Sequence, residues 1–457
     1  METIIVVIFI LGYLAIALEN NLKLDKLIPA LIMMAVLWAL VAFGIDSFPN
    51  WFDSAGQKLV EGFADFTLAE RHHLLEETLL HHMGKTAEIL FFLLGAMTIV
   101  EIIDYFDGFG TIKNFVKTKS KKKLLWIFAG MAFVLSSIID NLTATIVLVT
   151  ILQKIVPEKV TRLWFASLIV IAANAGGAWS PIGDVTTTML WIGKKVTSAK
   201  LMEYLIIPSI LCVVVPVYIA SFMKPFKGNI DISALADAGP KSKYGPRMLY
   251  LGLGAIIFVP IFKTITHLPP YVGMMLSLGV VAIFAELHSR TQFNLTRLEE
   301  NEGEDAAVGF HSPVHRSLSR IEMPSVLFFF GILMAVAALE SLGILFNGAE
   351  ALKLMVPNTD IVIMALGVGS AVIDNVPLVA ASMGMFQEPI DDHLWHFVAY
   401  SAGTGGSMLI IGSAAGVVAM GMEKISFTWY LKNITGLAAA GFLAGAIAFM
   451  LIRNLTF

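Results

Sequence analysis

The chain has 457 residues, of which 57% are hydrophobic and only 14% are charged, and its mean hydropathy is +0.78. Soluble domains carry roughly 25% charged residues, so this composition excludes an ordinary soluble protein and indicates a polytopic membrane protein. The net charge is −4, and the basic residues do not gather in a stripe. The single cysteine, Cys212, lies in an apolar run. We therefore expect no nucleic-acid partner, no internal disulfide, no zinc or haem centre and no cofactor.

Long apolar windows follow one another along the chain and predict all-α spans. The windows are about 3–19, 27–44, 87–106, 124–156, 163–192, 203–223, 248–264, 270–287, 323–345, 360–388, 394–421 and 427–452. Two of them are too long for one span and carry an acidic residue midway, Asp140 in 124–156 and Asp374 in 360–388. A lipid-facing helix does not tolerate a central carboxylate cheaply, so we interpret both windows as re-entrant hairpins.

The distribution of basic residues sets the predicted orientation. If both hairpins return to their own side, ten crossings remain, and most of the 31 basic residues then fall in loops on one side. Cytoplasmic loops carry the excess of Lys and Arg, so that side is predicted to be the cytoplasm. Both termini are then predicted to lie outside.

Two connections are long enough to need separate interpretation. The outer connection, 45–86, contains leucines at helical spacing and the histidines His72, His73, His81 and His82. This pattern predicts an amphipathic helix at the membrane surface, and the histidines belong either to a solvated helix face or to a pH sensor. The inner connection, 288–322, is polar and of mixed charge, which favours a flexible connector.

An internal repeat relates the two halves of the chain. The segment 136–143 (SSIIDNLT) recurs as 370–377 (SAVIDNVP), and 176–184 (GGAWSPIGD) recurs as 405–413 (GGSMLIIGS), both about 230 residues later. Each half holds five crossings and one hairpin, and because five is odd the second half is inverted. We predict a first repeat over 1–223, a cytoplasmic linker over 224–247 and a second repeat over 248–457, with broken helices at 163–192 and 394–421. This is the plan of secondary transporters, whose substrate site lies near the membrane midplane.

The repeated segments contain the candidate ion site. Gly-rich and Pro-containing stretches inside an apolar span break the helix and free backbone groups, which is tolerated where they line a polar cavity. Carboxylates and neutral oxygens together suit a small hard cation. The carboxylates that we expect to bind Na⁺ are Asp140, Asp374 and Asp184, and the neutral candidates are Asn141, Thr143, Asn375, Ser136, Ser370, Asn174, Ser180, Thr404 and Ser407.

Structural alternatives remain open for several of these residues. A single Ser, Thr or Asn in a membrane helix more often forms an interhelical hydrogen bond than a ligand contact. Asp184, whose counterpart in the repeat is Ser413, either contributes a third carboxylate or caps the half-helix that follows it. Glu101 and Glu88 lie nearer to span ends and form a second tier of candidates.

These segments closely resemble the NhaD-type sodium/proton antiporters of the ion transporter superfamily, which also contains arsenite permeases and dicarboxylate or citrate carriers. The resemblance is carried by the stretches 88–101, 140–145, 174–189, 374–377 and 405–407. It implies a bacterial inner-membrane protein that exchanges internal Na⁺ or Li⁺ for external H⁺, with a scaffold and a moving part, surrounded by lipid and commonly a homodimer. No other protein partner is evident.

The main alternative is a sodium-coupled dicarboxylate carrier of the same fold. Such carriers typically have Ser-Asn-Thr at the hairpin tips, whereas here Asp precedes each Asn, and Pro377 stands where Thr is expected. Two carboxylates would repel an anionic substrate. An enzyme or a channel subunit has little support, since the sequence offers no nucleophile with a histidine base, no phosphate loop and no filter-like run.

Overall fold

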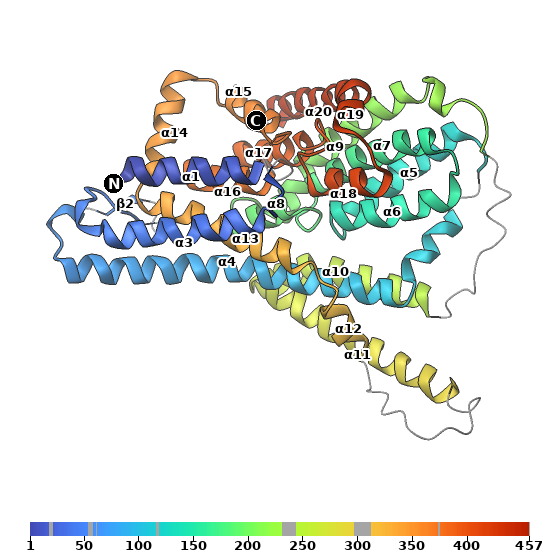
Figure 1. Cartoon of the computed structure of the whole chain (residues 1–457), viewed down its shortest axis with the longest axis horizontal. Helices are drawn as coiled ribbons and strands as arrows, with labels where there is room; N and C mark the ends of the chain where they lie inside the picture. The colour runs from blue at the N-terminus through green and yellow to red at the C-terminus, as the bar shows by residue number, and fades with distance from the viewer. Residues whose placement is uncertain are drawn as a thin grey trace.

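The computed structural model describes residues 1–17, 22–53, 58–60, 62–115, 118–230, 244–296, 312–372 and 375–456. This part of the chain is an all-α membrane protein (Figure 1), apart from a short antiparallel pair of strands, β1 (Phe52–Asp53) and β2 (Lys58–Leu59). Within it, seven helices of at least 18 residues are apolar enough to cross a membrane. Asp374 and residues 297–311 of the predicted 288–322 connector lie outside the described residues.

One set of helices, here called the scaffold group, packs through α3 against α13 and through α11 against α4. Its members are α1 (Glu2–Ala17), α3 (Leu27–Phe43), α4 (Leu68–Tyr105), α10 (Gly245–Thr266), α11 (Pro270–Thr296), α12 (Pro313–Leu318) and α13 (Met323–Ser341). Long α4 starts at the left of Figure 1 and packs against α11 and α13.

The second set, the hairpin group, packs mainly against itself, with α9 on α20, α5 on α7 and α15 on α17. Its members are α5 (Lys121–Ser136), α6 (Asn141–Ile155), α7 (Lys159–Ala178), α8 (Val185–Ile192), α9 (Ser198–Ala220), α15 (Thr359–Gly369), α16 (Asn375–Met385), α17 (His393–Gly405), α18 (Ala414–Glu423), α19 (Phe427–Asn433) and α20 (Thr435–Thr456). The remaining elements are α14 (Ile344–Met355) and the 3₁₀ turns η1 (Ile45–Ser47), η2 (Phe63–Asp65), η3 (Gly108–Phe115) and η4 (Lys224–Phe226).

Both predicted hairpins are present, α5 with α6 and α15 with α16, and they lie toward opposite ends of the molecule in Figure 1. Both broken helices are present as well. The break between α7 and α8 covers 179–184, where Pro181 lacks the amide needed to continue the helix. The break between α17 and α18 covers 406–413.

Matching contacts at the two hairpins support the predicted repeat. The Ser136 hydroxyl donates to the Ala173 carbonyl over 2.6 Å, and the Ser370 hydroxyl donates to the Ala402 carbonyl over 2.8 Å. Each bond joins the first arm of a hairpin to the broken helix of the same half. The boundaries proposed for the repeats stay predictions.

The outer connection differs from its prediction. A capping box at Thr67 and Glu70 starts α4 at Leu68, so the histidine-rich segment is helical as expected but is continuous with the next span. The predicted loop over 45–86 therefore ends about 20 residues early. His82 is buried, which a solvated helix face does not explain, whereas His72 and His73 are exposed.

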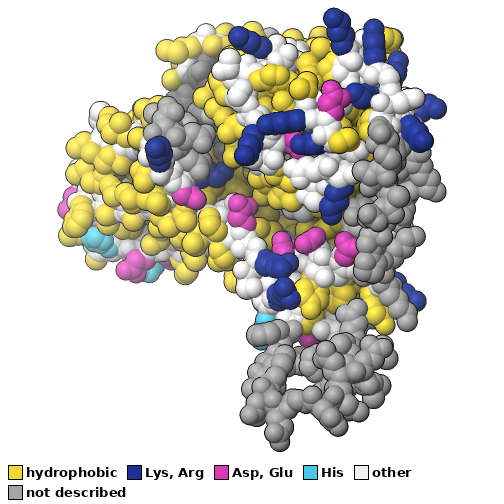
Figure 2. Space-filling model, turned by 45° about the vertical axis from the view of Figure 1, so that its right-hand side comes forward, with side chains coloured by type: hydrophobic (Ala, Val, Ile, Leu, Met, Phe, Trp, Pro, Cys, Tyr) yellow, Lys and Arg dark blue, Asp and Glu magenta, His cyan; other side chains and the backbone are white. Residues whose placement is uncertain are grey.

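Basic side chains gather at one end of the molecule. Figure 2, which brings the right-hand end of Figure 1 forward, shows many Lys and Arg side chains there. At this end Lys121 pairs with Glu158 over 2.8 Å and so joins the starts of α5 and α7. Hydrogen bonds from Lys121 and Thr161 lower the pKa of the Glu158 carboxyl. The orientation in the membrane remains the predicted one.

Candidate functional site

The two broken helices place equivalent residues at the start of their second halves. Asp184 precedes α8 and Ser413 precedes α18, and both have φ −147° and ψ 151°. The Ser413 hydroxyl caps its helix by accepting from the Gly416 amide over 3.2 Å. The Asp184 side chain makes no capping hydrogen bond. The capping alternative for Asp184 is therefore wrong.

A cavity of about 90 Å³ separates the scaffold group from the hairpin group next to these residues. That volume accommodates a partly hydrated small ion, since a water molecule occupies roughly 30 Å³ in the liquid. Its polar lining from the hairpin group is Asp140, Asn141, Thr143, Asp184, Thr188 and Asn375, and its lining from the other side is Lys26, Phe92, Leu93, Ala96, Met97, Glu322, Ser325 and Phe329.

Asp140 stands at the tip of the first hairpin, where it caps α6. Its Oδ1 accepts from the Thr143 amide over 2.7 Å, and its Oδ2 accepts from the Thr143 hydroxyl over 2.9 Å. A carboxylate offers about four acceptor positions, so these two bonds fix its orientation and leave lone pairs that can coordinate a cation.

Amide side chains connect the hairpin tips to the broken helices. In the first half, Asn141 Nδ2 donates to Asn174 Oδ1 over 3.0 Å, and Asn174 Nδ2 donates to Ser413 Oγ over 2.9 Å. From the second repeat, Asn375 Nδ2 donates directly to Asp184 Oδ2 of the first repeat over 3.0 Å. The tip of each hairpin is thereby linked to the start of the half-helix that belongs to the other repeat.

The other predicted neutral ligands do not line this cavity. Ser136 and Ser370 bond to helix carbonyls, as described above. Ser180 Oγ accepts from the Ile182 amide over 3.4 Å. The hydroxyls of Thr404 and Ser407 each donate over 2.6 Å to a carbonyl of α17. The hydrogen bonds of these residues stabilise the hairpins and the helix breaks, and the residues do not line the cavity.

The second-tier glutamates also lie away from the lining. Glu88 and Glu101 are partly buried on α4, and Glu101 interacts electrostatically with Asp104 and Arg320. Sequence reasoning missed Lys26, Glu322 and Ser325, which lie directly before or at the start of apolar runs. A polar residue at a span end is usually interfacial, so only the packing of the two groups identifies them as cavity residues.

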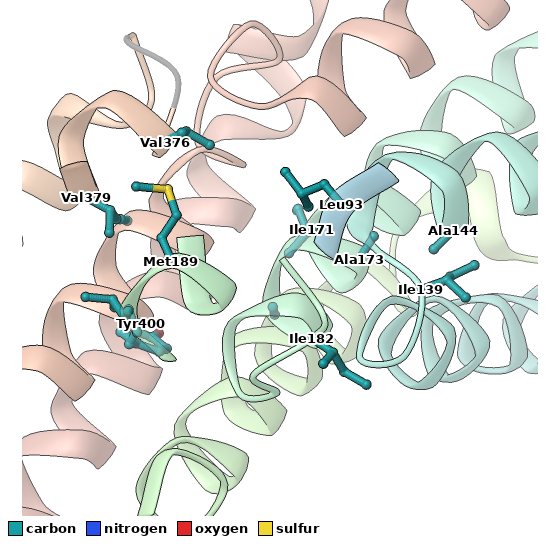
Figure 3. Close-up of a cluster of buried hydrophobic side chains, with 14 of the residues drawn as sticks. Leu93, Ile139, Ala144, Ile171, Ala173, Ile182, Met189, Val376, Val379 and Tyr400 are labelled. Atoms are coloured by element: carbon teal, nitrogen blue, oxygen red, sulfur yellow. The ribbon is translucent and has the colours of Figure 1, made fainter. Parts of the chain in front are cut away.

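A second cavity, of about 160 Å³, lies farther toward the start of α4. Its ionisable lining consists of His81, His82, Lys85, Lys195 and Glu340. Ile89 and Met189 line this second cavity, whereas Leu93 and Thr188 line the first. Figure 3 shows Met189 beside Val376 and Val379, with Leu93 and Ile182 on the other side of the close-up.

Two opposed hairpins, two broken helices and a carboxylate-lined cavity between two helix groups define an inverted-repeat membrane transporter. The family model described as Citrate transporter matches residues 6–391. The chain is 40% identical to "Sodium/proton antiporter 1" of Arabidopsis thaliana, over 98% of this chain and 72% of that protein. It is 30% identical to "Na(+)/H(+) antiporter NhaD" of Vibrio cholerae, over 98% of this chain and 91% of that protein. The chain belongs to the citrate transporter family, together with the NhaD proteins.

A solved structure supports the fold alone. The YdaH transporter of Alcanivorax borkumensis superposes with a TM-score of 0.58 over 95% of this chain and 99% of that chain, at 13% identity.

Proposed function

We propose that the protein exchanges cytoplasmic Na⁺ or Li⁺ for external H⁺ by alternating access. The observation that carries this proposal is the convergence of Asp140 and Asp184 on one cavity between the scaffold and hairpin groups. Carboxylate oxygens bind either a hard cation or a proton, so the two ions compete for one site. The relatives named as sodium/proton antiporters support the same assignment.

Under the predicted orientation, this cavity faces the cytoplasm. Lys26 and Glu322 at its edge belong to segments that the charge distribution assigns to the inside. The aspartates would then take Na⁺ from the cytoplasm and release it after the hairpin group moves against the scaffold. A bacterial inner membrane, outside termini and a homodimer surrounded by lipid complete the proposal.

The second candidate is a sodium-coupled carrier of dicarboxylates or citrate, favoured by the description of the matching family. The lining of the first cavity argues against it. Asp140, Asp184 and Glu322 are acidic, and Lys26 is the one basic residue that lines the cavity in the described part of the chain. An anionic substrate next to this excess of negative charge would pay several kcal/mol in like-charge repulsion.

Inverted membrane vesicles with an acidic interior and a pH-sensitive probe distinguish the two functions. We expect NaCl and LiCl to collapse the pH gradient, while KCl and succinate at matched ionic strength have no effect. Vesicles containing Asp140→Asn serve as the inactive control. Uptake of succinate or citrate that depends on Na⁺, with no cation-dependent proton movement, would instead establish the carrier.

A further inference from the structure

Two pairs of helices in the hairpin group combine elements of both repeats. The second arm of the first hairpin, α6, packs against α18 of the second repeat, and the second arm of the second hairpin, α16, packs against α8 of the first repeat. The helix starts of each pair are joined at the site by the amide bonds already described, from Asn141 through Asn174 to Ser413 and from Asn375 to Asp184. The far ends of both pairs, away from the site, have contacts of their own.

At the far end of the first pair, Arg162 joins the two helices. Its Nε lies 3.0 Å from Glu423 Oε2 and 3.2 Å from Glu423 Oε1, and Glu423 is the buried last residue of α18. Its Nη1 donates over 3.1 and 3.0 Å to the carbonyls of Val156 and Pro157, which directly follow α6. One guanidinium therefore bonds to the ends of both helices.

At the far end of the second pair, Asp391 joins the two helices. Its Oδ1 accepts from the Thr197 amide over 2.6 Å, and its Oδ2 accepts from the Thr197 hydroxyl over 2.9 Å. Its own amide donates to the Lys195 carbonyl over 2.9 Å, and Nε2 of the buried His396 lies 3.6 Å from its Oδ1. Because Lys195 and Thr197 follow α8 and Asp391 follows α16, these bonds link the two helix ends.

Arg162 and Asp391 occupy equivalent positions in the two repeats. They stand 229 residues apart, as do Gly176 and Gly405 of the repeated segments. Arg162 can only donate hydrogen bonds, whereas the Asp391 carboxylate accepts them, and each partner in the other repeat offers the complementary group. The same connection is thus made twice, with opposite chemistry.

We propose that Arg162 and Asp391 are positioning residues for transport, each of which ties the far ends of a helix pair so that the helix starts at the ion site move as one body. The inference rests on the proposed function and extends it. Neither residue lines the first cavity. Since α6 has 15 residues, Arg162 acts roughly 20 Å from Asp140. A helix pair joined only at the site can splay at its far end, so that a shift of one repeat no longer carries the other.

The first test concerns Arg162. In proteoliposomes, we expect Arg162→Gln to lower the maximal rate of Na⁺-dependent proton movement per folded protein about tenfold or more, with the KM for Na⁺ within about threefold of the wild type, because the amide bonds at the site remain. Arg162→Lys, which keeps one charged donor, should lie between them. Lys121→Gln is the matched control, because it removes an ion pair with Glu158 that lies within the first repeat. Its maximal rate should equal that of the wild type.

The second test concerns Asp391. Asp391→Ala removes both acceptors and should reduce the maximal rate as Arg162→Gln does, whereas Asp391→Asn can still accept from the Thr197 amide and should retain more of the rate. The neighbouring Asp392 accepts from the Leu394 amide over 2.8 Å and caps α17 within the second repeat. Asp392→Ala therefore removes a cap without separating the helix pair, and its maximal rate per folded protein should stay near the wild-type value.

Wild-type maximal rates in Arg162→Gln and Asp391→Ala would overturn the inference, and so would equal losses in Lys121→Gln and Asp392→Ala. A rise in the KM for Na⁺ at an unchanged maximal rate would also contradict it. Should Arg162→Gln fail to fold, the comparison of Asp391→Ala with Asp392→Ala decides the question. Absence of Na⁺-dependent proton movement in the wild type would instead contradict the proposed function.

Discussion

Asp140 combines two properties that rarely occur together in a membrane helix, a formal charge and a fixed orientation. Thr143 donates to both of its carboxylate oxygens, and the carboxylate lines the cavity. We predict that Asp140→Asn abolishes Na⁺-dependent proton movement and leaves the protein folded, because the amide keeps the shape but loses the exchangeable charge. Asp374→Asn is expected to behave alike on the grounds of the repeated motif. Size-exclusion profiles measure folding, and vesicle assays measure Na⁺-dependent proton movement. Normal exchange in either variant would show that its carboxylate is not needed for transport.

Ser136 and Ser370 are expected to behave differently from the aspartates. Their hydroxyls hold the hairpins to the broken helices through carbonyl bonds, and the loss of one such bond costs about 1 kcal/mol. Ser136→Ala and Ser370→Ala should therefore lower the unfolding temperature and leave the KM for Na⁺ near the wild-type value. A large KM change without loss of stability would show that these hydroxyls contact the ion after all.

Among single residues, those that lie inside apolar runs were predictable from the sequence, whereas those that join the site only through tertiary packing were not. Asp140, Asn141 and Asn375 were predictable because a charged or amide group inside an apolar run is expensive unless it has a use. The bridge from Asn174 to Ser413 and the cavity position of Glu322 depend on how two distant segments pack. No local pattern encodes that contact.

At the scale of elements, the close crossing of each hairpin with its broken helix depends on glycine. A Cβ at Gly176 would overlap the Phe133 carbonyl oxygen, and one at Gly405 would overlap the Gly367 carbonyl oxygen. We predict that Gly176→Ala and Gly405→Ala each destabilise the protein by about 1–3 kcal/mol or more, because backbone cannot yield as a side chain does. Thermal unfolding in detergent measures the change.

Gly130 on α5 provides the matched control, because a Cβ there meets no atom within 4 Å. Gly130→Ala should be neutral or slightly stabilising, by up to about 1 kcal/mol, since alanine favours a helix over glycine. Similar losses in all three variants would mean that glycine acts through helix flexibility rather than close approach.

The broken helices and hairpins were predictable at this scale because Gly, Pro and central aspartates interrupt runs that would otherwise be single spans. The length of α4 was not predictable from the sequence. Its first half is polar enough to resemble a surface segment, and its continuity with the span depends on tertiary contacts such as those of buried Arg71, which donates to carbonyls of the 45–66 connection.

For the whole molecule, the predicted orientation is open to a direct test. Glu76 on α4 and Lys123 on α5 are exposed, and the native Cys212 is buried and leaves a low background. We predict that an impermeant thiol reagent added outside cells labels Glu76→Cys and not Lys123→Cys. Labelling of Lys123→Cys alone would invert the orientation and turn the first cavity to the outside.

The number of carboxylates in the site predicts how exchange responds to voltage. Asp140 and Asp184 share the cavity, and like charges in low dielectric cannot all remain ionised without a cation. Two protons can therefore replace one Na⁺, so that each cycle moves net charge. With pH clamped equal on both sides of proteoliposomes, an inside-negative diffusion potential should then drive Na⁺ out. Flux that ignores the potential would indicate exchange of one Na⁺ for one proton.

The two cavities come close to each other at α4 and α8. Ile89 and Leu93, one turn apart on α4, and the adjacent Met189 and Thr188 on α8 line opposite cavities. Under the predicted orientation, the first cavity belongs to the cytoplasmic side and the second to the outer side. With water in both cavities, the membrane voltage would then fall across a layer about one helical turn thick, roughly 5 Å, instead of a hydrocarbon core of about 30 Å. The local field is then several times that in the surrounding lipid. A carboxylate that shifts past this layer by a single turn does nearly the full electrical work of crossing the membrane, about 2.3 kcal/mol per charge at 100 mV.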